Sequence, residues 1–389
     1  MATVRKRILP SGLVRWRASY TDGAGIRRKK QFSRKSEADA WLVEICHDVA
    51  RGVHTPGSIS PTVKEAAALW IKRCNEKRLE STTIKGYEEH VDLHIVPFIG
   101  AKKLSELTVP AVNGFADKLR DAGRSAEMIR RAVRSLGAVF KEARRRGLSN
   151  VDPTSGIEFD LPDREDPRAV IPTKSELQAM IAGAAGRWRP VILVAIFCGL
   201  RASELRGLRW ADVDFDARQL NITQRADASH KIGRLKSKAG YRSIPCPSGV
   251  LNALREWKLL CPKGDLGLVF PNGIGKVESY SNLVEHGFRP IQLAAGISER
   301  RQAADPAGKP AVDAAGAPVM IEAAKYGMHA LRHACASLWI ENGYNPKQIQ
   351  RLMGHSSIKV TFDVYGHLFA DPGADQRAAE SVQARLLGS

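Results

Sequence analysis

Basic and apolar positions alternate over residues 4–32, with a turn signal at Asp22-Gly23 between two such runs. Alternation of this kind is typical of β-strands that are covered on one face. The next stretch instead has helical spacing, with apolar residues at Ala38, Trp41, Leu42, Ile45 and Val49. We therefore predict that residues 1–57 form a small sheet with one helix.

Helical periodicity dominates residues 63–155, after a segment at 54–62 whose Pro, Gly, Ser and Thr content is typical of a linker. The clearest helix lies within residues 125–147, where apolar side chains recur on one face at Ile129, Val133, Leu136 and Phe140. Basic residues occupy other positions of this helix, including Arg130, Arg131 and Arg134. The pattern predicts a helix bundle with one basic side.

A second linker, residues 151–168, is rich in proline and acidic residues and leads into a third region, residues 169–389. This region opens with a capping-box pattern at Thr173 and Glu176. Its apolar run at 190–200 predicts a buried helix that ends near Gly199. Residues 296–326 are rich in Ala, Gly and Pro, and we interpret them as a loop.

The apolar run is too short to span a membrane, and the N-terminus has no apolar core typical of a signal peptide. A cytoplasmic protein is expected, with no membrane partner. The 60 Lys and Arg residues against 41 Asp and Glu give a net charge of +19 and a pI near 9.9. Such an excess indicates a polyanionic partner and salt-sensitive binding, but does not distinguish DNA from RNA.

Chemically suggestive residues occur in order along the third region: Arg201 in CGLRASEL, Lys238 in KSKAGYRSIP, His329 and Arg332 in HALRH, and Tyr365 in TFDVYGHLF. Cleavage of a phosphodiester needs a nucleophile, positive charge on the phosphate oxygens and an acid for the leaving oxygen. These residue types supply all three, so neither a metal nor another cofactor is expected.

These segments resemble the tyrosine recombinases, the family that includes phage and conjugative-element integrases, in which the same motifs occur in the same order. The resemblance is strong over about residues 170–370 and looser before. It implies a mainly helical, multi-domain protein with small sheets: an arm-binding domain (1–57), a helical core-binding domain (63–155) and a mixed α+β catalytic domain with a C-terminal tail (169–389). The implied activity is site-specific DNA recombination, most simply the integration and excision of a phage or mobile element.

The resemblance also implies roles for individual residues. Tyr365 would be the nucleophile, forming a 3′-phosphotyrosyl bond that permits rejoining without ATP. Arg201 and Arg332 would clamp the phosphate oxygens, for which planar, permanently charged guanidinium groups are well suited. Lys238, expected at a hairpin tip, would be the acid for the 5′ oxygen; Lys236 competes for this role, but only Lys238 has the family's KxxxRxIP spacing.

Further roles fall to residues around these motifs. His329, on the same helical face as Arg332, would be the general base or proton shuttle for Tyr365. His355 would be a second histidine that donates a hydrogen bond to the phosphate. Glu204 would orient the active-site residues without contacting the phosphate itself. For His333 and His367, which adjoin the motifs, helix packing or solvation is the simpler interpretation.

The expected partner is double-stranded DNA carrying attachment sites, bound by a homotetramer, with a host DNA-bending protein and a directionality factor as possible additions. In the arm-binding domain of such integrases a three-stranded sheet lies in the major groove. The corresponding candidate contacts here are Arg15, Arg17, Arg27, Lys29 and Lys30, and those of the helical domain are Arg130, Arg131 and Arg134.

Three alternatives stay open. A metal-dependent nuclease would need paired carboxylates, for which Asp212, Asp214 and Asp216 form the only local cluster. A non-cleaving DNA-binding regulator would be expected to lack some of the motif residues. A chromosome-dimer resolvase or invertase of the same family usually lacks the additional N-terminal basic domain.

Overall fold

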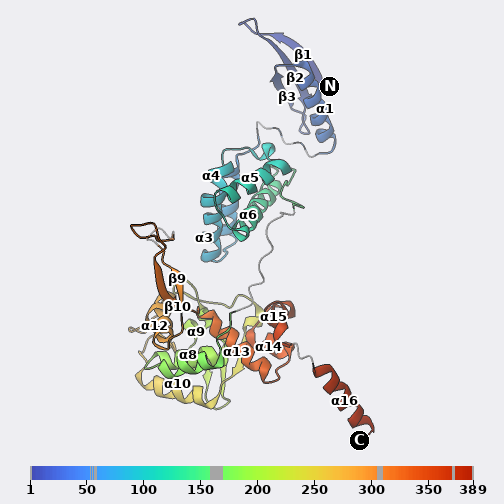
Figure 1. Cartoon of the computed structure of the whole chain (residues 1–389). Coiled ribbons are helices and arrows are strands. Elements are labelled where there is room, and N and C mark those ends of the chain that lie inside the picture. Colours follow the sequence, from blue (N-terminus) through green and yellow to red (C-terminus); the bar gives the residue numbers. More distant parts are fainter. Residues whose placement is uncertain are drawn as a thin grey trace. The chain divides into compact units, whose positions relative to one another are not determined.

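The computed structural model describes residues 2–52, 54, 56, 59–157, 170–304, 310–369 and 373–387. Contacts divide the chain into two compact units, Met1–Asp166 and Pro167–Ser389 (Figure 1). The acidic part of the predicted second linker, from residue 158 on, lies outside the described residues.

The first unit opens with an antiparallel sheet in the order β1-β2-β3 and one helix against it. The elements are β1 (Thr3–Ile8), β2 (Val14–Thr21), β3 (Arg27–Phe32) and α1 (Lys35–Ala50). The turn between β2 and β3 begins at Asp22, whose carboxylate accepts hydrogen bonds from the Ala24 and Ile26 amides. Ala18, Tyr20, Ala38 and Leu42 form the buried core between sheet and helix. The predicted sheet with one helix is therefore confirmed.

Alternation along β2 gives the sheet two different faces. Ala18 and Tyr20 point to α1, so Arg15 and Arg17 point to the opposite, open face. The strand register adds further cations to this open face, which carries Arg5, Arg7, Arg15, Arg17, Arg27 and Lys29.

Lys30 lies on the other side of the sheet. It pairs with Ala18, and its ammonium is 5.1 Å from the Trp41 ring and 5.2 Å from the Phe32 ring. Lys30 therefore packs beside α1 and is separated from the four basic residues with which the sequence analysis grouped it. One position along a strand is enough to change the face.

The other described elements of the first unit are helical, as predicted. Its helices are α2 (Val63–Glu76), α3 (Ser81–Glu89), a π-helical segment (His90–Ile95), α4 (Val96–Ile99), α5 (Val109–Asp121) and α6 (Ala126–Arg145). The predicted apolar face of α6 is buried at Ile129, Val133, Leu136 and Phe140. Glu142 on the same helix is buried too and accepts hydrogen bonds from Arg145 and Arg146.

The described residues of the second unit form a helical core and three small antiparallel sheets. Its helices are α7 (Lys174–Gly183), α8 (Trp188–Cys198), α9 (Ala202–Gly207), α10 (Ser248–Leu260), α11 (Tyr280–Leu283), α12 (Arg289–Ala294), α13 (His329–Glu341), α14 (Pro346–Met353), α15 (Ile358–Tyr365) and α16 (Ala374–Leu387). Its strands are β4 (Val213–Asp214), β5 (Gln219–Ile222), β6 (Arg225–Ala226), β7 (Ile232–Gly233), β8 (Arg242–Pro245), β9 (Ser298–Gln302) and β10 (Met320–Ala324). The predicted capping box at Thr173 and Glu176 is present.

Two predictions about this unit are wrong. Lys238 is not at a hairpin tip, because Lys238–Gly240 is a single 3-10 turn that leads directly into β8. Residues 296–326 are not a plain loop, because β9 and β10 pair as a hairpin that extends from the body of the unit (Figure 1). Among the described residues, no helix combines the length and apolar character needed to cross a membrane.

Candidate active site

The helices α8 and α14 each end in a left-handed glycine, and a motif residue follows each glycine. Gly199, with φ 60°, ends α8, and Arg201 directly precedes α9. Gly354, with φ 63°, ends α14, and His355 follows. A glycine adopts this conformation without the steric cost that a side chain would add. The predicted helix end near Gly199 is thus confirmed, and the two chain reversals bring distant motifs together.

A buried carboxylate links two of the arginines. Glu204 is 2 % exposed and accepts hydrogen bonds from the Arg201 amide (2.9 Å) and the Arg201 Nη1 (2.8 Å). It also accepts two bonds from Arg242, at 2.8 and 3.1 Å. Burial acts to raise the pKa of Glu204, but hydrogen bonds and charge from Arg242, with the charge of Arg201, lower it to about 2. Glu204 therefore holds both guanidinium groups while fully ionised.

The C-terminal end of α14 holds the same two arginines and Arg332 as well. The last carbonyls of a helix have no partner within the helix and carry its negative dipole end. Three consecutive carbonyls here each accept one guanidinium bond: Leu352 from Arg242 (2.7 Å), Met353 from Arg332, and Gly354 from Arg201 (3.1 Å). One helix end thus gathers three cations at one place.

Arg332 is the most deeply buried of the expected phosphate ligands. It is 2 % exposed, and its Nη1 donates to the Gly199 carbonyl at 2.6 Å. Burial and the neighbouring Arg201 lower the pKa of Arg332 to about 9, so it stays charged at neutral pH. Since both of its described partners are carbonyl groups, Arg332 keeps a positive charge that no carboxylate contacts directly.

Tyr365 is buried as well, at 1 % exposure, on the last turn of α15. Its hydroxyl lies 2.8 Å from Nδ1 of His333, and its ring is stacked on that of His355 with centroids 6.2 Å apart. Burial raises the pKa of Tyr365 to about 12, although the charge of Arg332 acts in the opposite direction. Nearby cations alone therefore do not make this phenol acidic.

The site histidines are uncharged at neutral pH. Burial, followed by the charges of neighbouring cations, lowers the pKa of His333 to about 4, that of His355 to about 3, and that of His329 below its usual value. His355 is oriented by a 3.0 Å hydrogen bond between its Nδ1 and the hydroxyl of Thr361, which is fully buried.

A cavity of about 300 Å³ opens beside these groups. Arg201, His329 and Tyr280 contribute to its lining. Lys238 is exposed, on a turn that touches the other end of the site, since the Ala239 carbonyl lies close to Gly354. The structure thus brings Arg201, Arg332, His355 and Tyr365 together at the C-terminal end of α14, with His329 at the cavity and Lys238 on the neighbouring turn.

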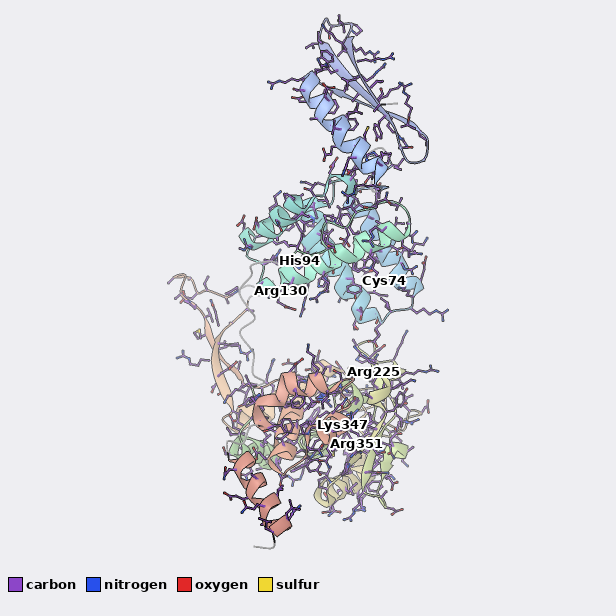
Figure 2. The ribbon with its side chains drawn as sticks, turned by 90° about the vertical axis from the view of Figure 1, so that its right-hand side faces the viewer. Cys74, His94, Arg130, Arg225, Lys347 and Arg351 are labelled. Carbon is purple, nitrogen blue, oxygen red and sulfur yellow. The ribbon has the colours of Figure 1, made fainter. Side chains whose placement is uncertain are left out.

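The sequence analysis assigned no role in the site to three residues of this region. His333 was interpreted as a packing residue, yet it contacts the Tyr365 hydroxyl. Lys347 and Arg351 lie one turn apart on α14 (Figure 2). They line a second cavity, of about 410 Å³, with Tyr241 and His355. Their i, i+4 spacing just before the GH motif is a signal that the sequence does contain.

The acidic cluster considered for metal binding has another role. Asp212 accepts hydrogen bonds from Arg209 and Thr223, and Asp214 accepts bonds from the turn amides of Asp216 and Ala217. Across the part of the chain that the structure describes, no three His, Cys, Asp or Glu side chains are grouped as a metal site would require.

The candidate DNA contacts of the first unit differ in their surroundings. Arg131 forms an ion pair with Glu127 on the surface of α6, with 3.0 Å between Nε and Oε1, and Arg134 is exposed on the same helix. Arg130 also lies on α6 (Figure 2). It is half-buried. On the sheet, Arg27 and Lys29 are exposed, whereas Arg15 and Arg17 are half-buried.

Comparisons with known proteins agree with this site. The model of the phage integrase family matches residues 173–371, and that of the phage integrase N-terminal SAM-like domain matches residues 62–120. A tyrosine recombinase XerC-like protein of Caldanaerobacter subterraneus is 24 % identical over 93 % of this chain and 92 % of its own length.

Solved structures share the fold. The Tn1549 transposon integrase in complex with a circular intermediate DNA superposes with a TM-score of 0.64 at 21 % identity, covering 83 % of this chain and 99 % of that one. A lambda integrase tetramer bound to a Holliday junction superposes with a TM-score of 0.55 at 16 % identity, covering 90 % and 95 %. With its motif residues assembled in one site and the family model matched over more than half of its length, the chain belongs to the phage integrase family, whose members are tyrosine-type site-specific DNA recombinases.

Proposed function

We propose that this recombinase cuts and rejoins DNA through a 3′-phosphotyrosyl bond to Tyr365. The observation that carries the proposal is the convergence of Arg201 and Arg332 on the end of α14, next to the buried Tyr365 hydroxyl. Preorganised cations in a dry site stabilise the charge that develops on a phosphate far better than mobile cations in water. Attack by Tyr365 conserves the energy of the broken bond, so rejoining needs neither ATP nor another cofactor.

The other site residues complete the proposed reaction. His355, held by Thr361 beside the Tyr365 ring, donates a hydrogen bond to a phosphate oxygen. His329 faces the same phosphate from the cavity lining. Lys238, on the exposed turn next to Gly354, protonates the departing 5′ oxygen, a role that a mobile ammonium group can perform once DNA covers it.

We also propose that the natural reaction is the integration and excision of a mobile element, carried out in the cytoplasm on attachment-site DNA. The open basic face of the N-terminal sheet would enter the major groove, and basic residues of α6 would contact the backbone. Four protomers would pair two duplexes, with two rounds of strand exchange through a four-way junction. A host DNA-bending protein and a directionality factor are further partners in this proposal.

The likeness to the XerC-like protein favours a second candidate function, the resolution of chromosome dimers. The two functions differ in substrate. A resolvase recombines two copies of one identical site, whereas an integrase joins two different attachment sites. Recombination of plasmids carrying the flanking DNA of the gene, tested with identical and with unlike site pairs, separates them.

The chemistry is tested with a nicked suicide duplex in EDTA, resolved on a denaturing gel. Wild-type protein is expected to form a covalent protein–DNA adduct, and Tyr365→Phe, which removes one oxygen, is expected to bind the same DNA without forming any. Tyr344→Phe, a change of the same kind on the loop before α14, is the matched control and should keep the adduct. If wild-type protein forms no adduct on DNA that it binds, a non-cleaving DNA-binding regulator becomes the better interpretation.

A further inference from the structure

The hydroxyl of Tyr365 has a neighbour to which the proposed reaction assigns no task. His333 lies one turn along α13 from His329, and its Nδ1 is 2.8 Å from Tyr365 Oη. The two rings meet edge to face, with centroids 5.6 Å apart. A general base must be within hydrogen-bonding reach of the proton that it removes, and this contact meets that condition before any DNA is bound.

Tyr365 needs such an acceptor because it is sealed from water. With 1 % of its surface exposed, its hydroxyl has little access to bases in solution. Its raised pKa means that the free phenolate is almost absent at neutral pH. Proton removal must therefore accompany the attack on phosphorus, and the acceptor must already lie at the hydroxyl.

His329 is placed differently. Its ring stands perpendicular to that of His333 at 4.6 Å between centroids, and it lines the cavity next to Arg201. Among the described side chains, His333 is the one that hydrogen-bonds to the Tyr365 hydroxyl. The two histidines of HALRH thus have different neighbours: His329 lies at the cavity proposed for the phosphate, and His333 contacts the nucleophile Tyr365.

The surroundings of His333 keep it ready to accept a proton. His329 and Arg332 flank it on α13, Tyr365 faces it from α15, and His355 faces it from the turn after α14. Of these influences, burial acts most strongly, and His329 and Arg332 add to it, so the pKa of His333 is lowered and the imidazole is neutral. When a phosphate binds at Arg332, its negative charge offsets that of the guanidinium and makes a transient imidazolium less costly.

We propose that His333 is the general base that takes the proton of Tyr365, a role that rests on the proposed function above. As Tyr365 Oη bonds to phosphorus, the phenol proton moves to His333 Nδ1. The bond from phosphorus to the 5′ oxygen breaks, and Lys238 protonates that oxygen. In rejoining, the 5′ hydroxyl attacks phosphorus, its proton returns to the lysine side, and His333 gives its proton back to the tyrosine.

The test is the single-turnover rate of adduct formation by the full-length chain on a nicked suicide duplex between pH 6 and 8. His333→Asn keeps an amide near the Tyr365 hydroxyl but removes the base. We expect a rate lower by roughly 10²–10⁴-fold at pH 7, with DNA binding unchanged. The wild-type rate should be flat over this range because His333 is already neutral, whereas the variant's rate should rise about tenfold per pH unit with the phenolate fraction.

Two controls separate the base from other roles. His367→Asn, two residues after Tyr365 and exposed, should behave like wild type. A substrate with sulfur in place of the 5′ bridging oxygen should restore adduct formation by Lys238→Ala, because a sulfur leaving group needs no acid. It should not restore adduct formation by His333→Asn, because the lost base acts on the nucleophile. Imidazole added to the buffer should partly restore His333→Ala, which a purely structural loss would not permit.

The proposal is overturned if His333→Asn keeps the wild-type rate and pH profile. It is also overturned if the sulfur substrate rescues His333→Asn, or if the steep pH profile arises in His329→Asn instead. Absence of an adduct from wild-type protein on bound DNA would be a different result, because it would refute the proposed function itself.

Discussion

Glu204 is the residue that allows three arginines to lie so close together. It is buried, and it bonds to Arg201 and Arg242, while Arg332 meets the same end of α14. Removing one partner of a buried ion pair leaves an uncompensated charge, which costs far more than losing an exposed pair. The carboxylate therefore has a structural role as well as an influence on the phosphate ligands.

Glu204→Gln is expected to lower the free energy of unfolding by about 3 kcal/mol at pH 7, and to reduce adduct formation because Arg201 and Arg242 lose their anchor. Urea unfolding measures the first effect. Glu299→Gln, which removes an exposed pair with Arg301, is the control and should cost less than about 1 kcal/mol. Equal effects of the two substitutions would contradict this role for Glu204.

The same residue predicts part of the acid sensitivity. Its pKa is about 2 in the folded chain and near 4.3 when unfolded, so its stabilising contribution is complete above about pH 4.3 and is lost as the pH falls to 2. Unfolding followed over this range should show a smaller acid-induced loss in Glu204→Gln than in wild type, by roughly 3 kcal/mol.

Among the structural elements, the ends of α8 and α14 organise the site. Gly199 ends α8, and its carbonyl accepts a hydrogen bond from Arg332. A Cβ at this position would lie 3.0 Å from both the Cys335 sulfur and the Met353 methyl carbon. The glycine thus meets two requirements at once, a left-handed backbone and close packing of three elements.

Gly199→Ala is therefore expected to destabilise the chain by about 2–4 kcal/mol. It should also weaken cleavage, because the strained backbone and the crowding both displace the Gly199 carbonyl that holds Arg332. Gly343→Ala is the matched control, because Gly343 has φ 82° but open space around it. It should cost only about 1–2 kcal/mol for the backbone and leave cleavage intact. Urea unfolding and the adduct assay check both, and an equal loss in the two variants would refute the packing argument.

The N-terminal sheet is the second element with a specific prediction. Arg17 lies on its open face and Lys30 on the face toward α1. Each phosphate contact adds about 0.9 to the slope of log affinity against log salt concentration. Arg17→Ala should lower this slope by about that amount for duplex DNA that includes the arm-type site, and Lys30→Ala should leave it unchanged. Fluorescence anisotropy measures both, and equal slopes would exclude binding through the open face.

At the scale of the whole molecule, the net charge of +19 predicts that salt affects DNA binding much more than it affects folding stability. Affinity for duplex DNA should fall about 10³–10⁵-fold between 50 and 200 mM salt, if six to ten phosphates are contacted. The unfolding midpoint should change little over the same range, because the site's ion pairs are buried and poorly screened. Anisotropy titrations and urea unfolding test this contrast, which a flat binding curve would refute.

Much of the architecture was predictable because it depends on local sequence. Helical periodicity identified α1 and α6, the capping box identified the start of α7, and alternation identified the first sheet. These patterns express the period of each element and the partners of its own backbone, which neighbouring residues largely determine. The order of motifs likewise indicated the chemistry, since it depends only on residue types and spacing.

The tertiary structure alone decided which partners meet. The bond from Arg201 to the Gly354 carbonyl joins residues 153 positions apart, and the contact of His333 with Tyr365 depends on how α13 packs near α15. Strand register, likewise, placed Lys30 away from Arg17. Each of these depends on rotations and displacements of whole elements, which arise from packing and which no local pattern encodes.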